Sequence, residues 1–249
     1  MPFLAAIVDA YRRTRKPKDI FWNRFVARPA AAVLLVPLER SPVTPNQVTF
    51  SSLLLFAGAM AVLVAMPGWP GLLLAVGLVE LSYVLDCVDG QLARLRGTST
   101  PVGAHLDFLM DELKAFMLVA SSGARLWHAS GDPRWLLAAL FGLGAVASAI
   151  CLTTFIRRPE YLAATGASRP VTAGDYGDGL AAPTAPQKWS PLRALEGLGR
   201  FLIHYPSYLV YVALLDRLDI FLPLYVAVNA AYAARAFLGV ALKLGRRAA

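Results

Sequence analysis

Residues 86–111 read DCVDGQLARLRGTSTPVGAHLDFLMD. Within this stretch an otherwise apolar chain carries four carboxylates, which belong to Asp86, Asp89, Asp107 and Asp111. An ionised carboxylate inside an apolar helix is costly, because it loses water and because each negative charge raises the energy of the others. Cationic groups must compensate this charge, and a pair of divalent metal ions is the obvious candidate.

The composition of the whole chain is that of a membrane protein. Of its 249 residues, 57% are hydrophobic and only 16% are charged, far from the balance of a soluble domain. About 20 consecutive apolar residues cross a bilayer as a helix. We therefore expect an all-α polytopic membrane protein with six transmembrane helices, placed at residues 47–66, 70–95, 102–126, 134–156, 199–216 and 219–242.

The apolar parts of the N-terminal region are too short to span a membrane. Residues 1–10 are apolar, but no small-residue cleavage site follows a long apolar core, which argues against a signal peptide. After a basic stretch, residues 20–38 mix aromatic and apolar side chains with arginines, and a break is expected at Pro29. This pattern favours an amphipathic helix in the membrane interface. Residues 1–46 are thus predicted to form a cytoplasmic and interfacial segment, and residues 47–249 a single six-helix membrane domain.

The net charge of +8 does not indicate a nucleic-acid partner. The basic residues alternate with the apolar spans instead of covering one aromatic-studded face, and the positive-inside rule accounts for them better. With both termini in the cytoplasm, only Arg125, Arg134 and Arg217 fall on the opposite side. The aspartate cluster then faces the cytoplasm. The abundance of Ala, Arg and Gly hints at a bacterium with a GC-rich genome, and hence at a bacterial cytoplasmic membrane.

Two short turns and one long segment connect the expected spans. An uncharged turn at residues 67–71 joins the first two spans as an antiparallel hairpin, and residues 94–101 form the cytoplasmic turn that follows the second span. The polar segment of about residues 158–198 has little periodicity, and we expect it to be a flexible cytoplasmic loop.

The spacing of the carboxylates places them on defined helix faces. Asp86 and Asp89 are three residues apart, so on a helix they share a face. Gly90 and Ala93 fall on that same face and leave room for a ligand. A second stripe, with a repeat of four residues, begins the third span at Gly103, Asp107 and Asp111. The short turn between the two spans brings the stripes together at one membrane depth.

Carboxylate oxygens are the ligands that hard divalent cations such as Mg²⁺ and Mn²⁺ prefer. Zinc would be expected to recruit His or Cys, and only His105 is near. Two divalent ions would balance the four carboxylates and clamp a diphosphate, leaving one carboxylate to act as a base. Intramembrane carboxylates also serve as a proton or cation pathway in transporters, although a transporter has no need of the Gly and Ala spacing.

The quoted stretch follows the pattern Asp-x2-Asp-Gly-x2-Ala-Arg-x8-Gly-x3-Asp-x3-Asp. At every fixed position this pattern resembles the defining motif of the CDP-alcohol phosphotransferases, and eight fixed positions are too many for a chance match. The segment from Thr44 to Thr49 similarly resembles the Pro-Asn-x-x-Thr sequence that this family places before its first span. Beyond about Phe116 the chain shows no further motif of the family.

Members of this family transfer a substituted phosphoryl group from a CDP-linked donor, such as CDP-diacylglycerol, to an alcohol and release CMP. The resemblance implies that Asp86, Asp89 and Asp107 hold two divalent metal ions. It implies that Asp111 lies near the second ion and is the general base. It also implies a homodimer and a role in phospholipid biosynthesis. The residues expected to contact the CDP part of the donor are Asn46, Thr49, Gly90, Ala93, Arg94 and Gly103.

The acceptor alcohol is the part of the reaction that the sequence leaves open. Arg157 and Arg158, where the fourth span ends, and Arg235, inside the sixth span, would bind a phosphate if they converge. Convergence would favour inositol phosphate or glycerol phosphate as the acceptor. Otherwise the first two arginines are membrane anchors and the third is a counter-charge to the aspartates. Serine, choline- or ethanolamine-type and lipid hydroxyl acceptors are then the alternatives within the enzyme class. An ion transporter is the alternative outside that class.

Overall fold

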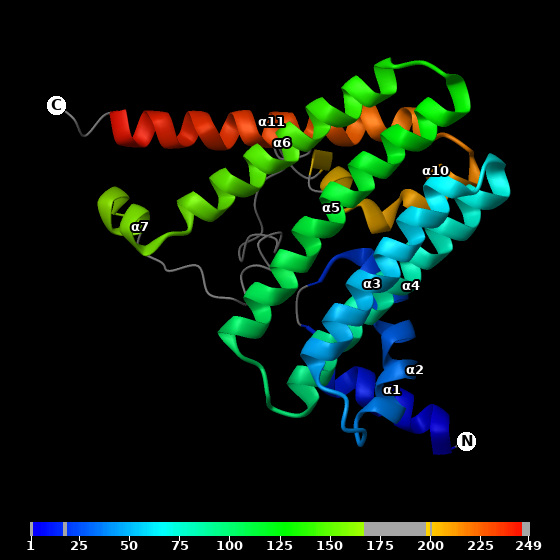
Figure 1. Cartoon of the computed structure of the whole chain (residues 1–249). Coiled ribbons are helices and arrows are strands. Elements are labelled where there is room, and N and C mark those ends of the chain that lie inside the picture. The colour runs from blue at the N-terminus through cyan, green and yellow to red at the C-terminus, as the bar shows by residue number, and fades with distance from the viewer. Residues whose placement is uncertain (1, 17–18, 167–197, 200, 246–249) are drawn as a thin grey trace.

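The computed structural model describes residues 2–16, 19–166, 198–199 and 201–245. These residues form helices and turns without any strand, so the all-α prediction is confirmed for them (Figure 1). In chain order the elements are α1 (Pro2–Thr14), the π-helical turn η1 (Asn23–Ala27), α2 (Arg28–Leu38), α3 (Pro45–Ala65), α4 (Gly68–Leu95), α5 (Pro101–Ser130), α6 (Arg134–Ile156), α7 (Pro159–Thr165), the 3₁₀ turn η2 (Tyr205–Ser207), α10 (Leu209–Leu214) and α11 (Leu218–Gly245).

Local signals in the sequence mark the start of α3 and the turn between α3 and α4. The hydroxyl of Thr44 accepts a hydrogen bond from the Gln47 N–H at 3.3 Å, and the Gln47 side chain accepts one from the Thr44 N–H at 2.8 Å. Pro45 stands in the first turn, where its missing N–H is not needed. Gly68 opens α4 with φ of +72°, a conformation that glycine adopts without strain. Helices α3 and α4 pack as the predicted antiparallel hairpin.

Helix α3 also packs against α5, while α6 packs against both α5 and α11 (Figure 1). Phe56, Leu118 and Phe221 come from three of these helices, and each is only 1% exposed in the shared core. Gly142 permits close contact between α6 and α11, because a Cβ there would lie 2.6 Å from a methyl carbon of Val226. The core thus holds in place the helices that carry the aspartates.

Four helices, α3, α4, α6 and α11, are long and apolar enough to cross a membrane. They correspond to the first, second, fourth and sixth expected spans. Helix α5, the third, has 30 residues but is less apolar, because it carries Asp107, Asp111, Lys114 and Arg125. The expected fifth span is divided near Pro206 into η2 and a six-residue helix, α10. That these two segments also cross the membrane, which would make six spans, therefore stays a prediction.

Helix α7 lies within the segment that was expected to be a flexible loop. It begins at Pro159 and is followed by Gly166, whose φ of +65° is left-handed. A proline in the first turn and a glycine after the last turn are the usual signals of a helix start and end. Residues 167–197 of the expected loop lie outside the described residues.

Residues 21–38 are helical on both sides of Pro29, so the break expected at this proline does not occur. In a regular α-helix a proline ring clashes with the carbonyl four residues before it. Here the preceding turn is π-helical, with the N–H of Arg28 bonded to the carbonyl of Asn23. The wider turn changes the position of the obstructing carbonyl, and the helical path passes from η1 into α2 without a break. Arg28 itself is buried and forms an ion pair with Asp19.

Two arginines bind backbone carbonyls at opposite ends of the α3–α4 hairpin. Arg96 donates to four carbonyls between residues 38 and 43, just after α2. Arg125 donates to three carbonyls between residues 63 and 68, at the turn from α3 to α4. The last carbonyls of a helix have no partner within it, so a guanidinium that binds several of them stabilises both the helix end and the turn.

Replacing Arg125 by Met keeps much of the side-chain volume but leaves three carbonyls without their donor. We expect the free energy of unfolding to fall by about 3 kcal/mol. Unfolding of the purified protein in detergent measures this change. Arg134→Met is the matched control, because the exposed Arg134 pairs with Asp132 at the surface. Equal losses in the two variants would contradict the structural role of Arg125.

Candidate active site

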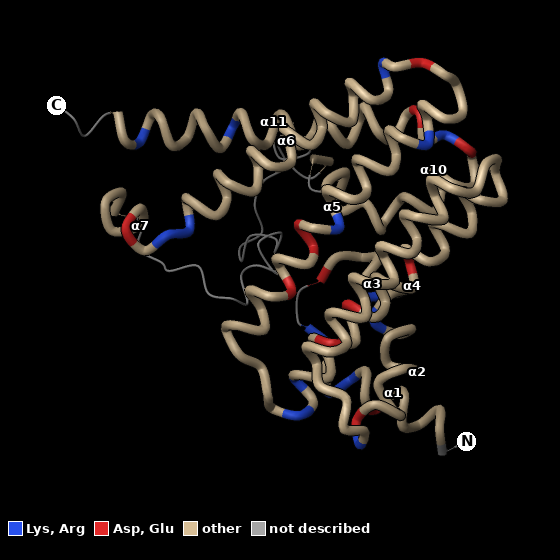
Figure 2. The backbone as a smooth tube through the Cα atoms, in the orientation of Figure 1, with Lys and Arg blue, Asp and Glu red and all other residues tan. Residues whose placement is uncertain are grey.

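Helices α4 and α5 bring three of the four aspartates to one point. Asp86, Asp89 and Asp107 each offer a carboxylate oxygen, and these oxygens all lie within 4.8 Å of one another. Figure 2 shows the acidic positions of α4 and α5 near one another in the middle of the molecule. The two stripes expected from residue spacing therefore do converge, because α3 packs against both helices and sets their separation.

Asp111 lies at the edge of this group and not among the three. Its side chain is about half exposed (54%), and its Oδ1 lies 3.4 Å from the Nζ of Lys114. Lys114 is almost completely buried and also forms an ion pair with Oδ1 of Asp86. An ammonium thus links the three-aspartate group to the fourth aspartate.

Helix α3 contributes hydroxyl groups that orient the aspartates. The hydroxyl of Thr49 donates to Oδ2 of Asp89 at 2.5 Å, and that of Ser52 lies 3.5 Å from Oδ1 of Asp86. Thr49 and Ser52 are three residues apart and therefore share the face of α3 that meets α4. Thr49 was expected to contact the donor's phosphates, and the structure shows it holding a carboxylate beside the cavity described below.

The group of three aspartates fits a divalent cation. Oδ1 of Asp107 is buried, and among the described residues it has no hydrogen-bond partner, so its lone pairs are available to a cation. Every ligand atom in the group is a carboxylate oxygen. This donor set suits Mg²⁺ or Mn²⁺ better than zinc, and His105, the nearest histidine in the sequence, has an exposed side chain.

A cavity of about 800 Å³ opens beside the aspartates, between the start of α3, the end of α4 and the start of α5. Three of the aspartates line it, namely Asp89, Asp107 and Asp111. All of the residues expected to contact a CDP group also line it, and these are Asn46, Thr49, Gly90, Ala93, Arg94 and Gly103. A Cβ at Gly90 would lie 3.3 Å from Nη1 of Arg94, so glycine keeps the space beside that guanidinium clear.

Arg94 is held by one edge of its guanidinium. Its Nε donates to the backbone carbonyl of Thr14 at 3.1 Å. Its Nη2 is buried, and within the described parts of the chain it has no hydrogen-bond partner. A guanidinium fixed in this way presents its other edge to an anion, for which its paired N–H groups are well suited.

The three arginines proposed for the acceptor are not equivalent. Arg157 lies over the ring of Phe108, with 5.2 Å from its Cζ to the ring centroid, and Phe108 lines the cavity. Arg158 and Arg235 are exposed and do not belong to the described lining of the cavity. Arg157 is not a lining residue either and adjoins the cavity only through Phe108, so the described structure does not show the three arginines converging on the cavity.

Several residues of the site have roles that the sequence did not assign. Lys16 and the turn at residues 98–101 line the cavity, and nothing in their local pattern indicated this. Ser52 shares a helix face with Thr49, so its contact with Asp86 follows the same spacing rule that placed the aspartates. Lys114 forms an ion pair with Asp86, and the sequence pattern did not predict this contact.

Comparison with known proteins supports this site. A family model described as CDP-alcohol phosphatidyltransferase matches residues 42–179, which is more than half of the chain and includes every aspartate of the cluster. Curated relatives include three proteins named bifunctional IPC transferase and DIPP synthase. That of Aquifex aeolicus is 35% identical over 101 residues, 40% of this chain and 22% of its own length. That of Thermococcus kodakarensis is 35% identical over 103 residues, 41% of this chain and 22% of its own.

The third, from Rubrobacter xylanophilus, is 34% identical over 97 residues, which is 37% of this chain and 21% of the relative. The matched segment therefore spans only about a fifth of the length of these relatives.

Replacing Asp107 by Asn keeps the shape of the side chain but removes one of the three converging carboxylate charges. We expect the affinity for Mn²⁺ to fall by about tenfold or more. Electron paramagnetic resonance of the free ion measures binding during a titration. Asp132→Asn, in the turn between α5 and α6, is the control. Equal Mn²⁺ binding by wild type and Asp107→Asn would mean that the metal binds elsewhere.

Proposed function

This chain belongs to the CDP-alcohol phosphatidyltransferase family, and from that premise we propose that it transfers a substituted phosphoryl group from a CDP-linked donor to an alcohol, releasing CMP. The donor is of the CDP-diacylglycerol kind, so the transferred group is phosphatidyl and the product is a phospholipid. One observation carries the proposal: a single cavity is lined by three of the four carboxylates, by Arg94 and by the small residues of the motif.

The donor's diphosphate would lie in this cavity between the aspartates and Arg94. Asp86, Asp89 and Asp107 would hold two divalent ions, Mg²⁺ or Mn²⁺, with Asp111 near the second ion. When bound, these ions supply the positive charge that neutralises a diphosphate and its leaving group. The open edge of Arg94 would bind a phosphate oxygen, while Gly90 and Ala93 leave space for the nucleotide.

Asp111 is proposed as the general base. It lines the cavity and lies at the edge of the cluster, where an acceptor hydroxyl can reach it. Its carboxylate takes the hydroxyl proton as the acceptor oxygen attacks the phosphorus linked to the lipid. The bond from that phosphorus to the CMP oxygen breaks, and CMP leaves with a negative charge that Arg94 stabilises.

A phosphorylated polyol, either inositol phosphate or glycerol phosphate, is the proposed acceptor. The three arginines do not line the cavity together, so this proposal depends on one of them: Arg157 lies over Phe108, which lines the cavity, and would supply a cation for the phosphate. The relatives named IPC transferase and DIPP synthase make the corresponding activities candidates for this chain. Serine, choline- or ethanolamine-type and lipid hydroxyl acceptors are the alternatives. The family match sets aside the ion transporter that the carboxylates alone left open.

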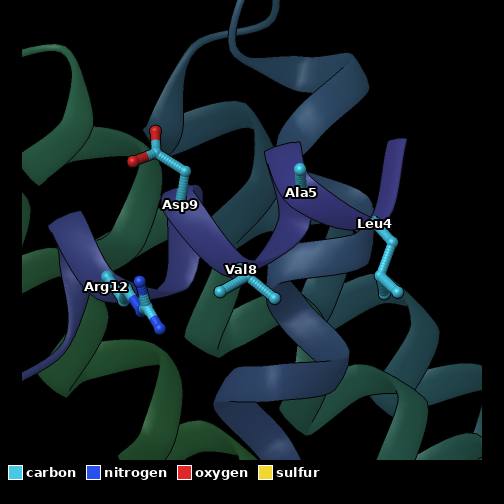
Figure 3. Close-up of a pocket in the computed structure, with 5 residues that line it drawn as sticks. All are labelled: Leu4, Ala5, Val8, Asp9 and Arg12. Carbon is cyan, nitrogen blue, oxygen red and sulfur yellow. The ribbon is translucent and has the colours of Figure 1, made fainter. Parts of the chain in front are cut away.

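We further propose that the site faces the cytoplasm of a bacterium and that the N-terminal segment, with α1 and the amphipathic stretch expected at residues 20–38, lies in the membrane interface. Phe3, Leu4 and Val8 on α1 are 56%, 62% and 40% exposed, which suits contact with lipid. Figure 3 shows Leu4 and Val8 with Asp9 and Arg12 around a shallow hollow on this helix, so charged and apolar groups adjoin as at a headgroup layer. Six spans and a homodimer are part of the same proposal.

Replacing Asp111 by Asn removes the proposed base and retains its shape. We expect CMP release from CDP-diacylglycerol to fall by about a hundredfold or more, while metal-dependent binding of the donor changes little. Product chromatography measures the first and equilibrium binding the second. Glu160→Gln on the exposed α7 is the control. Undiminished turnover in Asp111→Asn would disprove the assigned base.

Arg157→Met tests the class of acceptor. We expect the KM for inositol phosphate or glycerol phosphate to rise by about tenfold, because a charged contact to the phosphate is lost. Activity should be compared across a panel that includes serine, with Arg158→Met as the neighbouring control. If Arg157→Met leaves the KM for every phosphorylated acceptor unchanged, this arginine has no part in acceptor binding.

A further inference from the structure

Lys114 is a buried cation to which neither the family motif nor the proposed reaction gives a task. It lies on α5, three residues after Asp111, and its side chain is only 2% exposed. Its Nζ forms ion pairs with Oδ1 of Asp86 on α4 and with Oδ1 of Asp111 on its own helix. Both of these aspartates belong to the proposed metal site, so the inference that follows rests on the proposed function.

The position of Lys114 makes it more than an anchor between two helices. A buried ammonium is costly unless carboxylates surround it, and a carboxylate cluster is costly unless a cation is among it. In the structure the ammonium of Lys114 and the carboxylates of Asp86 and Asp111 balance each other's charge. Asp86 is also one of the three aspartates that converge within 4.8 Å. Lys114 and a divalent ion would therefore bind the same carboxylate, that of Asp86.

We propose that Lys114 is a resident counter-cation that holds Asp86 and Asp111 in position when the metal is absent and competes with divalent cations for Asp86. Two consequences follow. Repulsion between the ammonium and a divalent ion across a shared carboxylate lowers the affinity of the site for metal. At the same time the metal-free protein keeps its carboxylates assembled, because their mutual repulsion is partly neutralised.

A purely structural role for Lys114 predicts something different. If the lysine only ties α4 to α5, its loss loosens the aspartates and weakens metal binding. The variant is then less stable than wild type without metal, and the difference becomes larger in metal, because metal stabilises a weaker-binding variant less. If it is a counter-cation, its loss strengthens metal binding, and a divalent ion restores the stability that was lost. The sign of the change in metal affinity separates the two roles.

The test is a titration of the purified full chain in lipid nanodiscs with Mn²⁺, followed by electron paramagnetic resonance, together with unfolding temperatures in EDTA and in saturating Mn²⁺. The variants are Lys114→Met, which removes the charge, and Lys114→Arg, which keeps it. Lys243→Met, the same change at an exposed position on α11, is the matched control. None of these measurements depends on turnover.

We expect Lys114→Met to bind Mn²⁺ about tenfold more tightly than wild type, and Lys114→Arg and Lys243→Met to bind it as wild type does. Lys114→Met should melt well below wild type in EDTA and approach it in Mn²⁺. Unchanged or weaker Mn²⁺ binding by Lys114→Met overturns the proposal, and so does a variant that fails to fold even with Mn²⁺. A wild type that binds no Mn²⁺ would instead contradict the proposed function.

Discussion

Four negative charges in an apolar bundle have to be balanced inside the molecule, and the rest of the structure is arranged around that constraint. Lys114 neutralises part of the charge, and hydroxyl groups of α3 donate to or approach two of the carboxylates. Within the described part of the chain, Oδ1 of Asp107 is a buried carboxylate oxygen without a hydrogen-bond partner. Incomplete compensation of this kind would give the proposed site its affinity for cations, because a fully neutralised cluster would have no reason to bind one.

Helix α3 is the element that positions the two helices carrying the carboxylates. It begins at the Thr44 cap, packs against both α4 and α5, and carries the hydroxyl groups that meet the aspartates. Arg96 and Arg125 fix the segments next to its two ends by binding backbone carbonyls. The carboxylates therefore stand on helices whose separation is set by packing and not by the ions that they would bind. A catalytic site needs preorganisation of this kind.

Part of the site could be predicted from helical spacing. Asp86 and Asp89 are three residues apart on α4, Asp107 and Asp111 are four apart on α5, and the short turn between the helices indicated that the two faces meet. The CDP-contact residues that line the cavity were expected from the family resemblance and not from spacing. Features that depend on neighbours distant in the sequence could not be predicted. The partner of Lys114 is one, and the π-helical turn η1 that leads directly into α2 at Pro29 is another. Among the acceptor arginines, only the geometry separates Arg157 from the rest.

The bond from Arg94 to the carbonyl of Thr14 joins two parts of the molecule that have different surroundings. Thr14 is the last residue of α1, the helix assigned to the lipid surface, whereas Arg94 lines the cavity. Lys16, two residues later, lines the same cavity. With α1 in the headgroup layer, as proposed, one wall of the proposed nucleotide site would be attached to that layer. The surface charge and curvature of the host bilayer would then become physical parameters of substrate recognition.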